Sequence, residues 1–311
     1  MDIFTTMITP YKTDRTIDLE TAEKYVDWYF ENGLTGIFAI CQSSEIFCLT
    51  LEEKVALNKC VYERAKKLEK ESGRPFTVVS SGHTSDTIEE QARELNAIWE
   101  SGTDALIFIS NRLDPDNKGD DVFIENAEKL ISLLPKEAPL GVYECPYPYK
   151  RLITPKLLDW MVSTGRFRYT KDTCCDFALL DERNARLRGT GFSNLNANCQ
   201  SLLSSLKGGG EGYCGIMANF HPRLYSWLCK NYEKYPCEAE LVQGVLGTFG
   251  FMEGGLPYPE TAKYHMNLVG IPTNNIVRTQ PGDRMTDYAR RCVEQMKLVT
   301  DKLEELIRDL N

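Results

Sequence analysis

The sequence predicts an α/β fold in which a (β/α)8 barrel is followed by a C-terminal helical region. Short apolar runs alternate with amphipathic helical stretches, eight such runs occur, and the strand-like runs stop after about residue 222. Alternating units of this kind favour a parallel sheet, and eight of them favour closure of that sheet into a barrel. We therefore expect residues 1–222 to form the barrel with the active site, and residues 223–311 to form helices packed on it.

The expected strands are short apolar runs. They are TTMITP (5–10), GIFAIC (36–41), FTVVSSG (76–82), DALIFIS (104–110), LGVYEC (140–145), RFRYTK (166–171), ARLRGTG (185–191) and GYCGIMA (212–218).

Helix signals lie between these strands. Asp18 is the expected N-cap of a helix that ends at Asn32-Gly33, and Ser85 precedes a second helix closed by Gly102. The glycines of KGGGEG (207–212) follow a helix and precede a strand, which is the order of a turn rather than of a phosphate-binding loop. A last helical pattern covers residues 283–309.

Composition narrows the class of function. The 311 residues include 36 Lys and Arg against 45 Asp and Glu, a net charge of −9, and no basic run occurs, which argues against binding to nucleic acid or anionic lipid. No apolar run approaches the length of a membrane span. An odd number of cysteines, 11, and the absence of a secretory leader pattern predict a cytoplasmic protein. We expect a small-molecule ligand.

Metal and nucleotide sites have little support. The three histidines, His83, His221 and His265, lie far apart and no CxxC occurs, so we expect no metal site. The first strand and helix are joined by TTMITPYKTD, which has no glycine, so a dinucleotide site of the GxGxxG type is not expected there.

Polar residues at the ends of the expected strands are the candidates for chemistry, because the active site of a parallel barrel gathers there. Strand six ends in Lys171, where apolar surroundings would favour a neutral, nucleophilic amine. Strand five brings Tyr143 beside it as a proton relay, and strand two ends in the hydroxyl-rich loop 41–45. Taken singly, a lysine at a strand end is more often solvated and a strand tyrosine more often packed.

The order of these motifs resembles the dihydrodipicolinate synthase and N-acetylneuraminate lyase family of Schiff-base aldolases. The similarity runs along most of the chain, and its matching segments are TTMITPY, GIFAICQSSEIFCLTLEEK (the family's GTTGE or GSTGE loop), VVSSGHTSDTIEEQARELNAIWESGTDALIF, VYECPYP (Y-N-x-P), YTKDT (K-D-S), GYCGIMANFHP (G-x-x-S-x-x-A-N-x-x-P) and LPYPETAKYHMNLVG.

The resemblance implies roles for individual residues. Lys171 corresponds to the Schiff-base lysine and Tyr143 to the phenol that shuttles protons. Ser43 corresponds to the second hydroxyl of the loop, which belongs to a proton relay and helps to hold the substrate carboxylate, whereas Gln42 replaces the first hydroxyl. Ser44, with Cys41, stands where the family has glycine, so the carboxylate nest is altered.

Other positions depart further from the family. Ser110-Asn111-Arg112-Leu113 replaces P-P-Y-Y, and Pro148 replaces the arginine of the synthases, so we do not expect dihydrodipicolinate synthesis. Arg112 and Arg188 are expected to bind a polar or acidic substrate tail. Tyr169 shares the face of Lys171 and is expected to narrow the pocket, with Cys214 also assigned to substrate binding.

The resemblance thus implies a lyase or aldolase that forms an imine between Lys171 and a 2-keto acid, such as pyruvate or a close analogue, without a separate cofactor. A homo-oligomer, dimer or tetramer, is expected. Two alternatives stay open: a sugar-acid dehydratase that uses the same imine, and a catalytically silent barrel that binds a keto acid or sugar acid.

Overall fold

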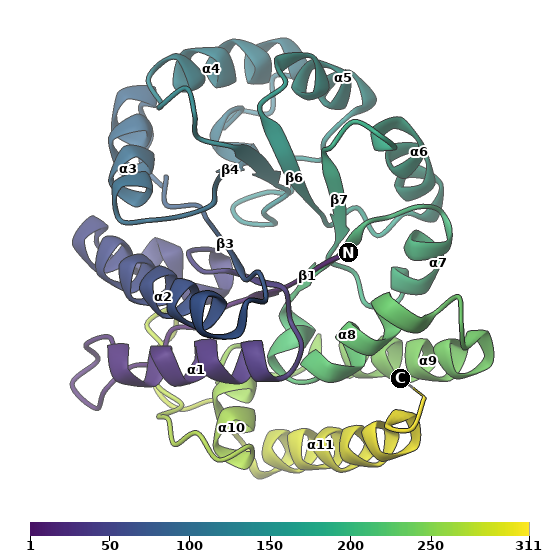
Figure 1. Ribbon diagram of the computed structural model, residues 1–311. Coiled ribbons are helices and arrows are strands. Elements are labelled where there is room, and N and C mark those ends of the chain that lie inside the picture. The colour runs from purple at the N-terminus through teal and green to yellow at the C-terminus, as the bar shows by residue number, and fades with distance from the viewer. Residues whose placement is uncertain (311) are drawn as a thin grey trace.

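The computed structural model describes residues 1–310 and confirms the barrel. Eight parallel strands close in chain order from β1 to β8, which pairs again with β1 (Figure 1). The strands are β1 (Asp2–Thr6), β2 (Gly36–Phe38), β3 (Thr77–Ser80), β4 (Ala105–Ile109), β5 (Leu140–Tyr143), β6 (Phe167–Asp172), β7 (Ser193–Asn196) and β8 (Gly212–Gly215).

Helices surround the barrel, one after each strand (Figure 1). They are α1 (Leu19–Glu31), α2 (Leu51–Ser72), α3 (Ile88–Glu100), α4 (Asp120–Ser132), α5 (Pro155–Thr164), α6 (Phe177–Leu187), α7 (Leu202–Lys207) and α8 (Pro222–Asn231). Asp18 caps α1 by accepting from the Thr21 backbone N–H, as predicted. Thr87, rather than Ser85, caps α3.

The prediction for the seventh strand was wrong. Residues 185–191 include the end of α6 and the turn after it, and β7 begins only at Ser193. Leu187 lies on the buried face of α6 with Leu180, Arg183 and Asn184, which are spaced as a helix requires. The polar sequence SNLN of β7 hid the strand, because Asn194 and Asn196 are buried polar residues that hydrogen-bond inside the protein.

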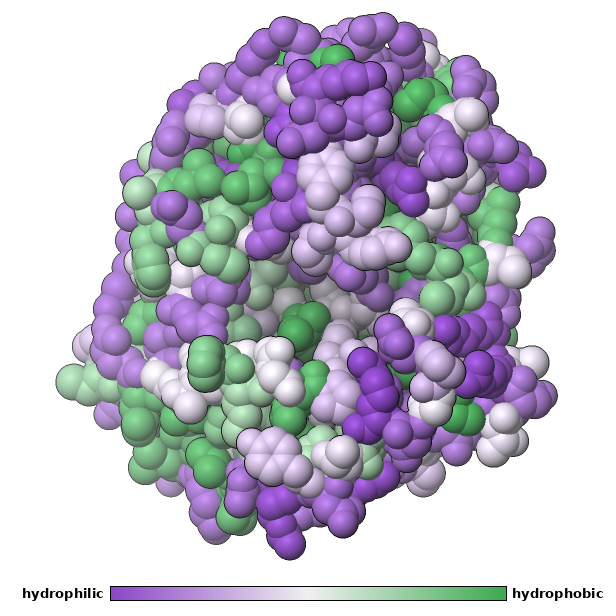
Figure 2. Space-filling view, turned by 180° about the vertical axis from the view of Figure 1, so that it is seen from behind, coloured by the Kyte–Doolittle hydropathy of each residue, from purple (hydrophilic) through white to green (hydrophobic). Residues whose placement is uncertain are grey.

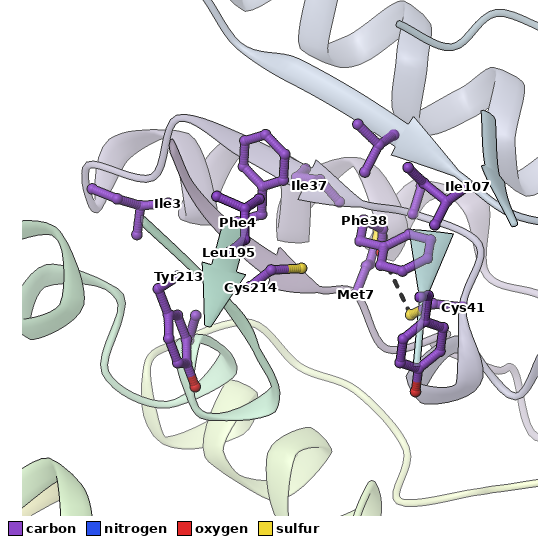
Figure 3. Close-up of a cluster of buried hydrophobic side chains, with 14 of the residues drawn as sticks. Ile3, Phe4, Met7, Ile37, Phe38, Cys41, Ile107, Leu195, Tyr213 and Cys214 are labelled. Carbon is purple, nitrogen blue, oxygen red and sulfur yellow. Dashed lines mark hydrogen bonds between the residues drawn. The ribbon is translucent and has the colours of Figure 1, made fainter. Parts of the chain in front are cut away.

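Side chains of the strands fill the barrel interior. Figure 3 shows Phe4, Leu195 and Cys214 gathered in one buried cluster with residues of the neighbouring strands. Phe4 packs against Tyr169 with 5.6 Å between ring centroids. The barrel is therefore a packed core with no open channel, and ligands must bind at one of its ends.

The C-terminal region adds α9 (Pro236–Glu253), α10 (Glu260–Leu268) and α11 (Asp287–Ile307), which lie along α8 and α1 (Figure 1). Thr300 of α11 hydrogen-bonds the ring Nδ1 of His221 at 2.7 Å, and Gln243 of α9 bonds the Leu203 backbone N–H of α7 at 2.8 Å. α8 follows β8 as the eighth barrel helix, whereas the predicted boundary at residue 222 assigned it to the appendage. Within residues 1–310, the helices that are long enough to cross a membrane are too polar to do so.

Gly212 allows the barrel to close, and replacing it should be costly. It has φ +155°, and a Cβ there would lie 1.8 Å from the carbonyl oxygen of Asp2, its partner in β1. Gly189 also has positive φ, +75°, but nothing lies within 4 Å of its Cβ position. We expect Gly212→Ala to lower the free energy of unfolding by roughly 1–3 kcal/mol more than Gly189→Ala, measured by urea denaturation. Equal losses would mean that the close approach to Asp2 costs nothing.

Candidate active site

A cavity of about 480 Å³ opens at the carboxyl ends of the strands. Figure 2 shows a hollow near the middle of one face, where apolar side chains lie recessed between hydrophilic ones. Segments after β2, β5, β6, β7 and β8 contribute to the lining, and the C-terminal region covers one side. The lining residues are Gln42, Ser43, Glu45, Tyr143, Pro146, Lys150, Lys171, Thr173, Cys175, Ala197, Asn198, Gly215, Ile216, Tyr258, Pro259, Thr279, Gln280 and Arg284.

Lys171 and Tyr143 lie side by side because β5 and β6 are paired with these two residues in register. The amine Nζ of Lys171 is 4.0 Å from the centroid of the Tyr143 ring, a cation–π contact. Within residues 1–310, this amine forms no hydrogen bond or ion pair that would hold it away from a ligand. Its side chain is 8% exposed and reaches the cavity, so a carbonyl compound in the cavity can meet it.

The Tyr143 hydroxyl donates a hydrogen bond to Oε1 of Gln42 at 3.2 Å. Burial raises the pKa of Tyr143 well above its ordinary value, so the phenol is protonated at neutral pH and serves as a donor. Gln42 therefore orients the phenol. An amide accepts this hydrogen bond but does not readily pass a proton on.

Three buried cysteine thiols, those of Cys41, Cys145 and Cys214, lie near the amine. Burial raises the pKa of Cys41 and raises that of Cys214 to about 12, while the charge of Lys171 opposes both shifts. Burial also raises the pKa of Cys145, whose Sγ lies 3.6 Å from Oε1 of Gln42. These thiols are neutral at physiological pH, so they supply no counter-ion to Lys171.

The loop after β2 is held by its own hydrogen bonds. Ser44 accepts from the Cys41 backbone N–H and donates to the Cys41 carbonyl, both at 2.7 Å. Ser43 faces the cavity and donates to Thr6 at 3.0 Å. Ser44 is fully buried outside the cavity, so its hydroxyl shapes the loop instead of meeting a ligand.

Glu45 anchors the C-terminal region to this loop. Its Oε1 lies 3.3 Å from Nζ of Lys263 in α10, and its Oε2 accepts the backbone N–H groups of Arg278 and Thr279 at 2.5 and 3.0 Å. Burial lowers the pKa of Lys263 to about 8, while Glu45 opposes that shift. Because Glu45 is fully occupied in this way, it closes the side of the cavity without offering a free carboxylate.

A second phenol, Tyr258, reaches the cavity from the segment between α9 and α10. Its hydroxyl accepts from Nδ2 of Asn219 at 3.3 Å, and Asn219 in turn accepts from Tyr29 at 2.6 Å. Burial raises the pKa of Tyr258, and hydrogen bonding to Ser43 opposes that shift. Ser43 and Tyr258 therefore form one patch of hydroxyl groups on the cavity wall.

Several residues expected at the site lie elsewhere. Arg112 packs on Phe47 and pairs with Asp86 at 3.3 Å. Arg188 bonds the carbonyl of Gly208 in the turn before β8, at the amino end of the barrel and far from the cavity, because the strand expected around it does not exist. Tyr169 and Cys214 face the barrel interior with Lys171, but they line a void of about 10 Å³ beneath it.

The cationic groups of the cavity are instead Lys150 and Arg284. Lys150 donates to the Thr173 carbonyl at 2.8 Å, and Arg284 pairs with Glu260. Lys150 follows β5, so a search for polar residues after the carboxyl ends of the strands could have found it from the sequence. Tyr258 and Arg284 come from segments outside the strands, and only the packing of the C-terminal region brings them to the site.

Comparisons with known proteins agree with this geometry. The model of the dihydrodipicolinate synthetase family matches residues 1–109. A 4-hydroxy-tetrahydrodipicolinate synthase of Jannaschia sp. is 24% identical over 297 residues, which cover 94% of this chain and 89% of that protein.

Two solved structures share the fold. A prophage protein of the dihydrodipicolinic acid synthase family from E. coli K12, in complex with pyruvate, has a TM-score of 0.81 at 19% identity, covering 97% of this chain and 98% of its own. CdNal from Clostridium difficile, in complex with mannosamine, has a TM-score of 0.81 at 15% identity, covering 96% of this chain and 98% of its own.

Proposed function

Because the chain is a divergent relative of the dihydrodipicolinate synthetase family, we propose that it is a lyase of the aldolase type that forms a Schiff base with a 2-keto acid. The observation that carries this proposal is the unpaired amine of Lys171 in the cavity, set against the ring of Tyr143. Imine chemistry requires a nucleophilic primary amine and a group that donates and accepts protons. Lys171, which has no ion-pair partner, and the Tyr143 phenol beside it meet these two requirements.

The reaction follows from these two groups. The amine of Lys171 adds to the keto carbon, and loss of water from the carbinolamine gives a protonated imine. When the bond between the third and fourth carbons of the acid breaks, its electrons enter the imine to form an enamine, and an aldehyde leaves. Tyr143 first gives the proton of its phenol to the departing water. The phenolate then takes the proton from the substrate hydroxyl that becomes the aldehyde. Protonation of the enamine and hydrolysis release pyruvate or an analogue.

The cavity also offers groups for the substrate carboxylate and tail. The hydroxyl of Tyr258, which accepts from Asn219, is placed to donate to a carboxylate, and Ser43, which donates to Thr6, lies beside it on the cavity wall. Lys150 and Arg284 give the cavity wall positive charge, which suits an acidic or polyhydroxylated tail. The assignments of Ser43 and Gln42 to this site stay predictions, as do a cytoplasmic location and a dimeric or tetrameric assembly.

Borohydride trapping tests the proposal. The protein is incubated with pyruvate and a panel of longer 2-keto acids, reduced, and analysed by intact mass and peptide mapping. We expect one reduced adduct per chain, confined to Lys171 and absent from Lys171→Ala. Lys150→Ala is the matched control, because it removes the other lysine of the cavity and should leave labelling of Lys171 in place. If no keto acid labels the folded protein, the alternative of a catalytically silent barrel that binds a keto acid or sugar acid is favoured over the enzyme.

A further inference from the structure

A buried ion triad lies behind the two reactive residues. The residue after Tyr143 is Glu144 and the residue after Lys171 is Asp172, and successive residues of a strand point to opposite faces. Both carboxylates therefore point away from the barrel interior. Arg183 of α6 reaches both of them, through Nη2 to Glu144 at 2.7 Å and through Nη1 to Asp172 at 2.6 Å.

The triad is almost entirely shielded from water. Arg183 and Asp172 are 1% exposed and Glu144 is 0% exposed. Glu144 also accepts the backbone N–H groups of Ile153 and Thr173, each at 2.7 Å. A buried group of this kind adds little net stability over an apolar replacement, but it fixes geometry because every partner is directional. Here it joins the carboxyl ends of β5 and β6.

We propose that Arg183 is a positioning residue that sets the distance between the Lys171 amine and the Tyr143 phenol by clamping Glu144 and Asp172. Arg183 is not among the residues that line the cavity. The inference rests on the proposed function for its effect on the trapping of pyruvate, whereas its effect on the methylation of the amine is independent of that function. Without Arg183 the ends of β5 and β6 stay joined by their ladder and by the bond from the Thr173 N–H to Glu144, but the two carboxylates are free to turn, so the amine shifts against the ring.

The test compares Arg183→Lys and Arg183→Met with Arg186→Met. Arg186 lies one turn further along α6 and also pairs with two carboxylates, Asp159 and Glu182, but on the exposed surface. Two rates are followed in folded protein by peptide mapping. One is borohydride trapping of pyruvate at Lys171; the other is reductive methylation by formaldehyde at Lys171, relative to exposed Lys129.

We expect at least a tenfold slower trapping in Arg183→Lys and at least a threefold change in the methylation ratio, with Arg186→Met unchanged. Unchanged values for both rates would overturn the proposal, since a purely structural arginine alters stability without altering the amine. If the Arg183 variants do not fold, Glu144→Gln removes the charge and one acceptor oxygen from the β5 side of the triad while Asp172 keeps its arginine, and the same criteria apply. Should pyruvate label no protein at all, the methylation ratio still decides the role of Arg183.

Discussion

Tyr143→Phe should lower the turnover number by about 100-fold to 10,000-fold with a verified substrate, the usual contribution of a positioned proton donor and acceptor. The variant keeps the ring on which Nζ of Lys171 rests and removes only the hydroxyl that donates to Gln42. In the variant, water can protonate the hydroxyl that leaves the carbinolamine in place of the phenol, so the imine should still form, and the final extent of borohydride trapping at Lys171 should stay within about threefold of the unchanged protein. Steady-state kinetics and trapping on the same preparation separate the two effects.

Tyr213→Phe provides the control for this experiment. Tyr213 is another buried tyrosine on a barrel strand, and its hydroxyl contacts Sγ of Cys199 at 3.6 Å, outside the cavity lining. Its removal should leave turnover nearly unchanged. An unchanged turnover number in Tyr143→Phe would contradict the assignment of Tyr143 as the proton relay. Loss of both trapping and turnover would mean that the hydroxyl is needed before the imine forms.

The reactive pair could be predicted from the sequence because both residues lie at or beside the carboxyl ends of strands that were predicted in the right place. The register of β5 and β6 then places the two residues side by side, since Tyr143 pairs with Lys171. Arg188 was misplaced for the opposite reason: the true seventh strand is polar, so hydrophobic pattern alone chose the end of a helix in its place. Because of this one wrong strand, Arg188 was predicted to bind substrate at the carboxyl end of the barrel, although it lies at the amino end.

The remaining wall of the cavity could not be predicted from local pattern. Tyr258 and Arg284 lie in segments with no strand signal, and they reach the site only because α10 docks through the buried pair of Lys263 and Glu45. That pair joins residues 218 positions apart in the sequence. Long-range contacts of this kind depend on tertiary packing, which short-range periodicity does not encode.

The same packing leaves a carboxyl group that should make stability depend on pH. Glu253, at the end of α9, is 1% exposed; its Oε1 accepts from the Thr261 hydroxyl, and within residues 1–310 its Oε2 has no hydrogen-bond partner. Burial raises the pKa of Glu253 from 4.5 to about 7. The folded state therefore binds this proton more tightly than the unfolded state does.

The sign of the effect follows from that difference. Below about pH 4.5 the proton is bound in both states and the full contribution is present; it is lost as pH rises through 4.5 to about 7. At about 1.4 kcal/mol for each pKa unit, the loss amounts to about 3 kcal/mol. Glu253→Gln is neutral throughout and its amide oxygen can still accept from Thr261, so it should escape this loss.

We therefore expect the free energy of unfolding of Glu253→Gln, relative to that of the unchanged protein, to rise by about 2.5 kcal/mol between pH 5 and pH 8, because part of the loss has already occurred at pH 5. Urea denaturation at both pH values measures it, and working with the difference cancels every other titrating group. Glu240→Gln is the matched control, because it lies in α9 but is exposed and pairs with Lys207. A difference that is the same at both pH values would show that Glu253 is ionised in the folded protein, with water or a rearranged donor at its second oxygen. The segment between α9 and α10, which places Tyr258 at the cavity, would then tolerate the charged carboxylate of Glu253 where it begins.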